Sequence, residues 1–140
     1  MNWSVGIDVG GTAIKAVVVD AEGTILKRKS LPTNDGADSV AEWTQNARQI
    51  IQDFEKEIGS TASSIGISAP GLAAADDRSI AYLPGKMEDI QGFNWTEALN
   101  RESLVPVLND AHAALLGEAW IGAVQGKQNV VLLTLGTGVG

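Results

Sequence analysis

The first part of the chain alternates short apolar, β-branched runs with brief turns, a pattern that predicts strands. The runs cover residues 3–9, 14–20 and 24–31, and glycine-containing turns separate them. Connections this short join strands that lie side by side and run in opposite directions. We therefore expect a three-stranded antiparallel meander.

A long amphipathic helix should follow the meander. Residues 34–38 predict a polar loop, and Ser39 with Glu42 three positions later makes a capping box that opens a helix. Gly59 is placed to end it. Apolar residues recur at helical spacing between these limits: Val40, Trp43, Ala47, Ile50, Ile51, Phe54 and Ile58.

The second half of the chain alternates strands with helices. Residues 64–68 and 105–108 predict two buried strands with a short helix between them, and residues 111–121 predict a longer helix. Residues 129–135 form a continuous apolar run, which predicts one more, fully buried strand. We expect an α/β fold in which a mixed five-stranded sheet precedes this last strand.

Composition narrows the class of protein. The chain has 140 residues and 44% hydrophobic content, which suits one domain with a real core. A net charge of −7 and the lack of any basic cluster longer than residues 27–29 argue against nucleic acid as a partner. The sequence has no cysteine, no leader pattern and no apolar stretch long enough to cross a bilayer. We expect a cytoplasmic protein without a membrane partner.

The turn after the first strand carries the first candidate chemistry. Asp8 ends an apolar strand, and Gly10, Gly11 and Thr12 follow it. Backbone amides in such an uncrowded turn suit phosphate oxygens, and a carboxylate beside them can hold hydrated Mg²⁺. The alternative is an ordinary hairpin turn in which the glycines supply positive φ angles.

A second carboxylate lies at a comparable place. Asn109 and Asp110 follow the apolar strand of residues 105–108 and precede a helix, where open α/β sheets bind ligands. A carboxylate there suits a general base that takes the proton of an alcohol during phosphoryl transfer. The alternative is that Asp110 only caps the helix.

A third motif, like the first, places small residues directly after an apolar run. Gly136, Thr137 and Gly138 follow the apolar run of residues 129–135, so their amides could hold the other end of a polyphosphate. The alternative is again a hairpin with glycines at positive φ. All three motifs follow predicted strands, and chance rarely supplies all three together, so their joint occurrence favours phosphate binding over separate hairpin turns.

The order of elements resembles the ribonuclease-H-like half-domain of the actin and hexokinase superfamily. The motifs D-x-G-G-T-x-x-K, N-D-A and L-G-T-G-x-G, in this order, further resemble the ROK family of bacterial sugar kinases and related repressors. The resemblance implies two lobes with nucleotide between them. Residues 1–128 would form the N-terminal lobe, and residues 129–140 the first strand and phosphate turn of the second.

The resemblance also implies roles for individual residues. Asp110 matches the catalytic base and Asp8 the carboxylate near Mg²⁺. Sugar hydroxyls would contact Asn109, Gly71 and, in a region of looser similarity, Asn94. The positions that match the ATP phosphate motifs are Gly10, Gly11, Thr12, Lys15, Gly136, Thr137 and Gly138.

Some of the family pattern differs or lies elsewhere. Leu108 and His112 stand where many relatives have glutamate and asparagine. The zinc-binding segment, a sugar-contacting glutamate and the adenine pocket of the family would all lie beyond residue 140. By itself the chain should therefore transfer little or no phosphate, because in-line transfer needs both lobes.

The leading hypothesis is the N-terminal lobe of an ATP- and Mg²⁺-dependent kinase acting on a hexose or amino-hexose. A sugar-responsive ROK regulator is the first alternative, although its DNA-binding domain would normally precede the phosphate turn. A non-catalytic nucleotide-binding module is the second. The sugar, the choice between ATP and polyphosphate as donor, and assembly into homo-oligomers stay open.

Overall fold

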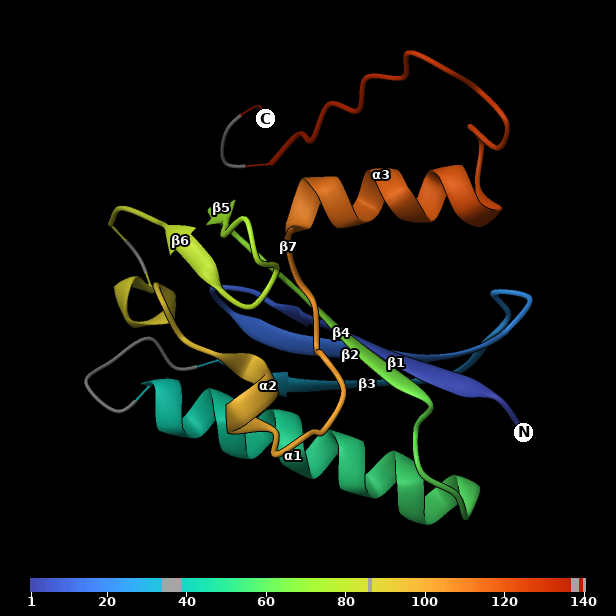
Figure 1. Cartoon of the computed structure of the whole chain (residues 1–140), viewed down its shortest axis with the longest axis vertical. Helices are drawn as coiled ribbons and strands as arrows, with labels where there is room; N and C mark the ends of the chain where they lie inside the picture. The colour runs from blue at the N-terminus through green and yellow to red at the C-terminus, as the bar shows by residue number, and fades with distance from the viewer. Residues whose placement is uncertain (34–38, 86, 137–138, 140) are drawn as a thin grey trace.

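A mixed five-stranded sheet forms the centre of the molecule, with long helices on both faces (Figure 1). The computed structural model describes residues 1–33, 39–85, 87–136 and 139. The strand order is β3-β2-β1-β4-β7. The strands are β1 (Trp3–Val9), β2 (Ala13–Asp20), β3 (Ile25–Pro32), β4 (Ser64–Ala69) and β7 (Val107–Asn109). The fold class expected from the sequence is confirmed.

The strands pair as the chain pattern requires. β1 runs antiparallel to β2, which runs antiparallel to β3, so the predicted meander is present. β1 also pairs in parallel with β4, and β4 in parallel with β7. A parallel pair needs a long crossover, and the helix α1 (Ser39–Ile58) supplies the first one.

Each sheet face has its own chemistry because strand side chains alternate between faces. On β1, Val5, Ile7 and Val9 are buried in the core shared with α1, while Ser4, Gly6 and Asp8 face the other way. β4 repeats this arrangement. On β1 and β4, one face is therefore a packed core and the other carries small and polar residues.

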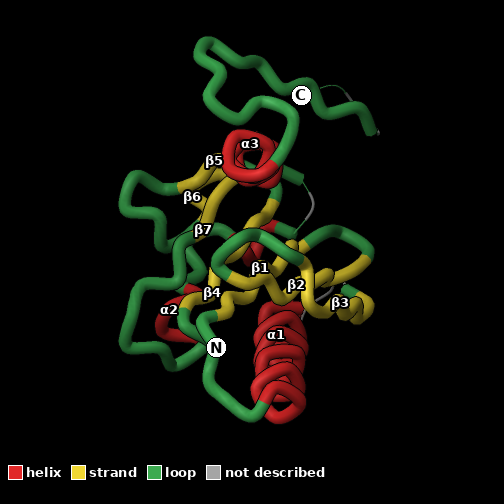
Figure 2. Tube along the Cα trace, turned by 90° about the vertical axis from the view of Figure 1, so that its right-hand side faces the viewer, coloured by secondary structure: helices red, strands yellow, loops and turns green. Residues whose placement is uncertain are grey.

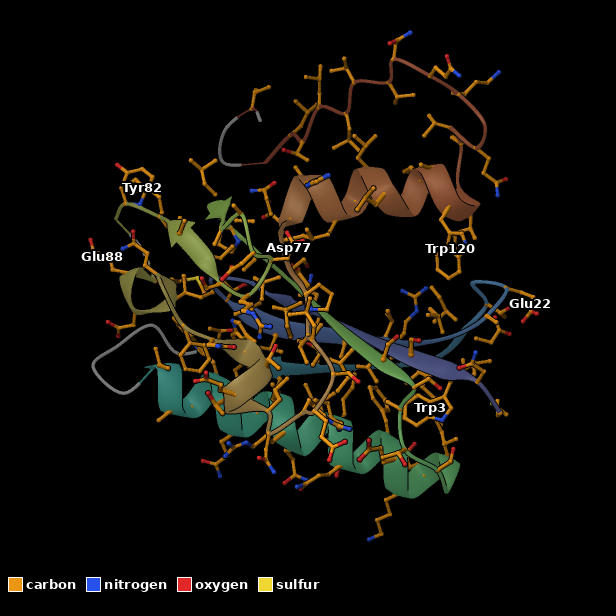
Figure 3. All side chains as sticks on the ribbon, viewed as in Figure 1. Trp3, Glu22, Asp77, Tyr82, Glu88 and Trp120 are labelled. Atoms are coloured by element: carbon orange, nitrogen blue, oxygen red, sulfur yellow. The ribbon has the colours of Figure 1, made fainter. Side chains whose placement is uncertain are left out.

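The helix α3 (Asp110–Ile121) lies over this second face (Figures 1 and 2). Its far end rests on the turn between β2 and β3, where a Cβ on Gly23 would come within 2.7 Å of Cγ2 of Ile121. Figure 3 shows Trp120 pointing toward this turn, near Glu22. No residue of α3 is buried, although the helix is rich in alanine and leucine. Among the described residues, no helix has the length and apolarity needed to cross a membrane.

A small hairpin between β4 and α3 is absent from the elements expected from the sequence. It consists of β5 (Leu72–Ala73) and β6 (Ile80–Tyr82), and the 3₁₀-helix η1 (Glu88–Ile90) and the short α2 (Trp95–Ala98) follow it. The strands are too short for a periodic pattern to show. The hairpin packs on Gly71, whose φ is +98°, and a Cβ there would lie 2.7 Å from the carbonyl oxygen of Tyr82.

The strand predicted for residues 129–135 is not formed. These residues run outside the regular elements, on the far side of α3 from the sheet (Figures 1 and 2). Val131 is 82% exposed and Leu135 80% exposed, and Leu135 makes one isolated bridge, to Val139. An apolar run becomes a buried strand only when another strand pairs with it, and none of the described strands does so.

The interaction of Lys29 with Asp53 ties β3 to α1 and should be visible in a titration. The Lys29 ammonium donates a hydrogen bond to Asp53, and the Gln49 amide donates another over 2.7 Å, so the pKa of Asp53 lies below its ordinary value of 3.8. The depressed pKa stabilises the fold above pH 3.8, and this contribution is lost as the pH falls through the folded-state pKa. We expect NMR titration of the Asp53 carboxyl to show a midpoint below 3.8, and the Lys29→Gln substitution to raise it. A midpoint that the substitution leaves unmoved would contradict this.

Gly71 and Gly59 offer a matched test of the packing at the hairpin. Both have positive φ, +98° and +80°, but a Cβ on Gly59 would meet open space. We expect Gly59→Ala to lower the free energy of unfolding by about 1 kcal/mol through backbone strain. Gly71→Ala should cost clearly more because steric overlap adds to the strain. Urea unfolding monitored by tryptophan fluorescence would measure both, and equal losses would exclude the overlap.

Candidate active site

Two carboxylates that are far apart in the sequence line one cavity. Asp8 lies near the carboxyl end of β1, and Asp110 begins α3 directly after β7. Both line a cavity of about 540 Å³ between the second sheet face and α3, together with Lys15 and Ser68. The parallel strands β1, β4 and β7 end at the same edge of the sheet, which is where open α/β sheets bind ligands.

Only one of the two carboxylate oxygens of Asp8 accepts a hydrogen bond within the described residues. The Ser68 hydroxyl donates a 2.7 Å hydrogen bond to its Oδ1. Within the part of the chain that the structure describes, Oδ2 receives no hydrogen bond, and the side chain is exposed. Lys15 is the cross-strand neighbour of Asp8 on β2 and shares the cavity. One carboxylate oxygen is thus available to a ligand.

The first glycine turn differs from an ordinary positive-φ hairpin. Neither Gly10 nor Gly11 is among the residues with positive φ. The Gly10 amide donates to the Ala13 carbonyl over 3.0 Å, so it closes the turn. The amides of Gly11 and Thr12 make no hydrogen bond within the described residues, and both residues are exposed. Gly11 and Thr12, rather than Gly10, therefore offer donors to an anion.

Asn109, rather than Asp110, caps α3. Its Oδ1 accepts from the amides of Ala111, at 3.0 Å, and His112, at 3.2 Å. Its Nδ2 donates to the carbonyl oxygen of Gly71 over 2.7 Å. Asn109 is therefore the capping residue, although Oδ1 of Asp110 also accepts a hydrogen bond from the Ala111 amide over 2.8 Å. The Asp110 side chain is exposed at the cavity.

All three residues predicted to contact sugar have structural partners here. Both polar atoms of the Asn109 amide are occupied, and the Gly71 carbonyl accepts one of those bonds. Asn94 caps α2, accepting from the amides of Thr96 and Glu97. It does not line the cavity that holds Asp8 and Asp110. Sugar contact by these residues stays a prediction.

Gly136, the residue of the second phosphate motif that the structure describes, does not line the cavity. Gly136 lies in the segment on the far side of α3, and Thr137 and Gly138 fall outside the described residues. The motif follows the run of residues 129–135, which lacks a pairing strand. Its proposed role depends on that strand forming.

Another groove of comparable size contains no motif residue. It has a volume of about 620 Å³ and lies beside α1 and the end of α2. Its arginines already have partners: Arg101 pairs with Glu55 at 3.0 Å, and Arg48 donates to the Ala98 carbonyl. The charged side chains in this groove hold α1 against the chain around α2. The candidate catalytic and metal-binding carboxylates, Asp110 and Asp8, line the other cavity.

Sequence reasoning missed Ser68 and the glycines beneath the cavity. Gly6 and Gly66 are neighbours across the parallel β1–β4 pair, and both line the cavity. They lie in strands, away from any turn, so no local motif marks them. Their position follows from the register, which places Ser68 directly beside Asp8.

The sheet order and the helix arrangement match the N-terminal lobe of actin- and hexokinase-like kinases. The family model described as "ROK family" matches residues 4–140. This chain therefore belongs to the ROK family.

Individual relatives agree with this assignment. A glucokinase of Halalkalibacterium halodurans is 36% identical over 143 residues, which cover 99% of this chain and 43% of that protein. A ROK family glucokinase from Streptomyces griseus, solved with glucose and AMPPNP, matches with a TM-score of 0.79 and 30% identity, covering 99% of this chain and 43% of its own. An inorganic polyphosphate/ATP-glucomannokinase from Arthrobacter gives a TM-score of 0.81 at 30% identity, covering 100% and 57%. The chain thus spans less than half the length of the curated glucokinase it matches.

The side-chain amide of Asn109 both caps α3 and bonds to Gly71, so its loss should lower the stability of the fold. We expect Asn109→Ala to lower the free energy of unfolding by about 1–2 kcal/mol, because it removes the cap and the bond to Gly71. Asn109→Ser should recover part of the loss by restoring a cap acceptor. His112→Ala, at an exposed position of the same helix turn, is the control and should change stability by less than about 0.5 kcal/mol. Urea unfolding measures all three, and an Asn109→Ala protein as stable as the control would contradict the assignment.

Proposed function

We propose that this chain is the N-terminal lobe of a kinase that transfers the γ-phosphoryl group of ATP to a hydroxyl of a hexose or amino-hexose. The observation that carries the proposal is the convergence of Asp8 and Asp110 on one cavity. The names of the relatives support the substrate class, because they include glucokinases. The reaction forms a bond between the sugar oxygen and phosphorus, breaks the bond to the ADP oxygen, and releases one proton.

Asp110 is the proposed base for that proton. Its carboxylate is exposed at the cavity, within the first turn of α3. Asn109 fixes the backbone on which Asp110 stands through its bonds to α3 and Gly71. A carboxylate that is anchored in this way keeps its place while it takes the hydroxyl proton.

The first glycine turn is the proposed contact for phosphate. Gly11 and Thr12 supply exposed amides, and Lys15 on β2 adds a positive charge to the cavity beside Asp8. In an acidic chain with a net charge of −7, such local donors are what attract an anion.

The residues around Asp8 fit a magnesium ion. Mg²⁺ keeps several waters and is usually held by one or two carboxylates together with substrate phosphates. The available Oδ2 of Asp8 matches this need, and the described residues include no group of three acidic or histidine side chains that would form a closed metal cage. When bound, the ion neutralises negative charge on the transferring phosphates. Asp8 would hold the ion or its water.

The test compares Asp110→Asn with wild type in the complete protein that the gene encodes. We expect kcat for ATP-dependent hexose phosphorylation to fall by about 10²- to 10⁴-fold, with a smaller change in KM for the sugar, because the variant loses the proton acceptor. Glu22→Gln removes the same charge at the distant β2–β3 turn and should leave kcat unchanged. A coupled assay for ADP measures the reaction.

Further arms of the same experiment separate the alternatives. Full activity in Asp110→Asn would remove the proposed base. Polyphosphate in place of ATP would identify the donor. Hexose binding without turnover in wild type would favour a sugar-responsive ROK regulator, and nucleotide binding without hexose binding would favour a non-catalytic module.

A further inference from the structure

Three polar side chains form a row across the edge of the sheet nearest the cavity. Ser68 on β4 pairs with Asp8 on β1, and Asp8 pairs with Lys15 on β2. All three face the second sheet face and line the cavity that contains Asp110. The neighbouring row on the same strands is Gly66, Gly6 and Val17, which offers no polar side chain.

The contact between Ser68 and Asp8 fixes the plane of the carboxylate. A carboxylate on an exposed strand position rotates readily about its last torsion, because that torsion has broad minima. The 2.7 Å bond from the Ser68 hydroxyl to Oδ1 holds that oxygen toward β4. The other oxygen, Oδ2, is thereby turned away from β4.

We propose that Ser68 is a positioning residue for Asp8, which orients Oδ2 toward the metal ion that accompanies the nucleotide. The inference deepens the proposed kinase function and rests on it for the identity of the ion. Ligating carboxylates are themselves held by hydrogen bonds, and loss of such a bond usually weakens metal binding about 10- to 100-fold. Ser68 acts through Asp8 and does not itself touch the substrate.

The chain offers a matched control on the same two strands. Ser64 of β4 and Ser4 of β1 also share a hydrogen bond, 2.7 Å long, on the same sheet face. That pair lies two rows below Ser68 and Asp8, and neither serine lines the cavity. Ser64→Ala therefore removes a cross-strand hydroxyl without touching Asp8.

The first measurement is of metal binding and needs no turnover. Mn²⁺ is titrated into the complete protein in the presence of ADP, and the free aqueous ion is followed by electron paramagnetic resonance. We expect Ser68→Ala to weaken Mn²⁺ binding by about 10-fold or more. Ser68→Thr should restore it, because threonine keeps the hydroxyl, and Ser64→Ala should match wild type. Equal Mn²⁺ affinity in wild type and Ser68→Ala would overturn the proposal.

The second measurement separates positioning from stability. In the ADP-coupled assay, Ser68→Ala should raise the Mg²⁺ concentration that gives half-maximal rate, while the KM for hexose at saturating Mg²⁺ stays unchanged. A purely structural role would instead lower the unfolding temperature of Ser68→Ala and Ser64→Ala alike, with no selective effect on the metal. That outcome would also count against the proposal.

The two proposals fail in different ways. If wild type phosphorylates hexoses but wild type and Ser68→Ala bind Mn²⁺ with equal affinity, the positioning role is wrong and the kinase function stands. If wild type shows no hexose phosphorylation yet binds Mn²⁺ with ADP in a Ser68-dependent manner, the positioning role stands and the sugar kinase function fails.

Discussion

The parallel pairing of β1 with β4 is the interaction on which the site depends. It sets Asp8 beside Ser68 and Gly6 beside Gly66, although sixty residues separate the partners in each pair. β4 then pairs with β7, which carries Asn109 and leads directly to Asp110. Because the three strands run in the same direction, their carboxyl ends share one edge, and that edge becomes the cavity. A register shift of one residue would turn Asp8 into the core.

Two adjacent residues have separate roles: Asn109 caps α3, and Asp110 is the proposed general base. The side-chain amide of Asn109 accepts a hydrogen bond from α3 and donates one to the carbonyl of Gly71. It thereby joins the start of the helix to the β5–β6 hairpin. Asp110 is left exposed at the cavity. Gly71 takes part through its backbone alone, and its positive φ and crowded surroundings require glycine. The hairpin that the sequence pattern did not predict thus helps to hold the proposed base.

The second face of the sheet differs from the first in how it is covered. α1 closes the first face with a dense apolar core, whereas α3 touches the second face and leaves a cavity of about 540 Å³ beneath it. Gly6 and Gly66, which carry no side chain, line that cavity. Leu116, Trp120 and the apolar run after α3 are exposed. The curated glucokinase that matches this chain is more than twice as long, so much of that protein has no counterpart among these residues.

The sequence by itself determined the meander, α1 with its end at Gly59, the strand near residue 65, α3, and the carboxylates as candidates. These features depend on local periodicity, capping and turn chemistry, which are written in neighbouring residues. Only the tertiary structure decided that Asn109 rather than Asp110 caps α3, that Ser68 holds Asp8, and that residues 129–135 stay outside the sheet. The Ser68–Asp8 bond and the bond from Asn109 to Gly71 join segments far apart along the chain. The cap itself is local, but two adjacent residues could each have supplied it, and the long-range bond to Gly71 goes with the choice of Asn109. An apolar run takes strand form only where a distant segment supplies its hydrogen-bonding partner.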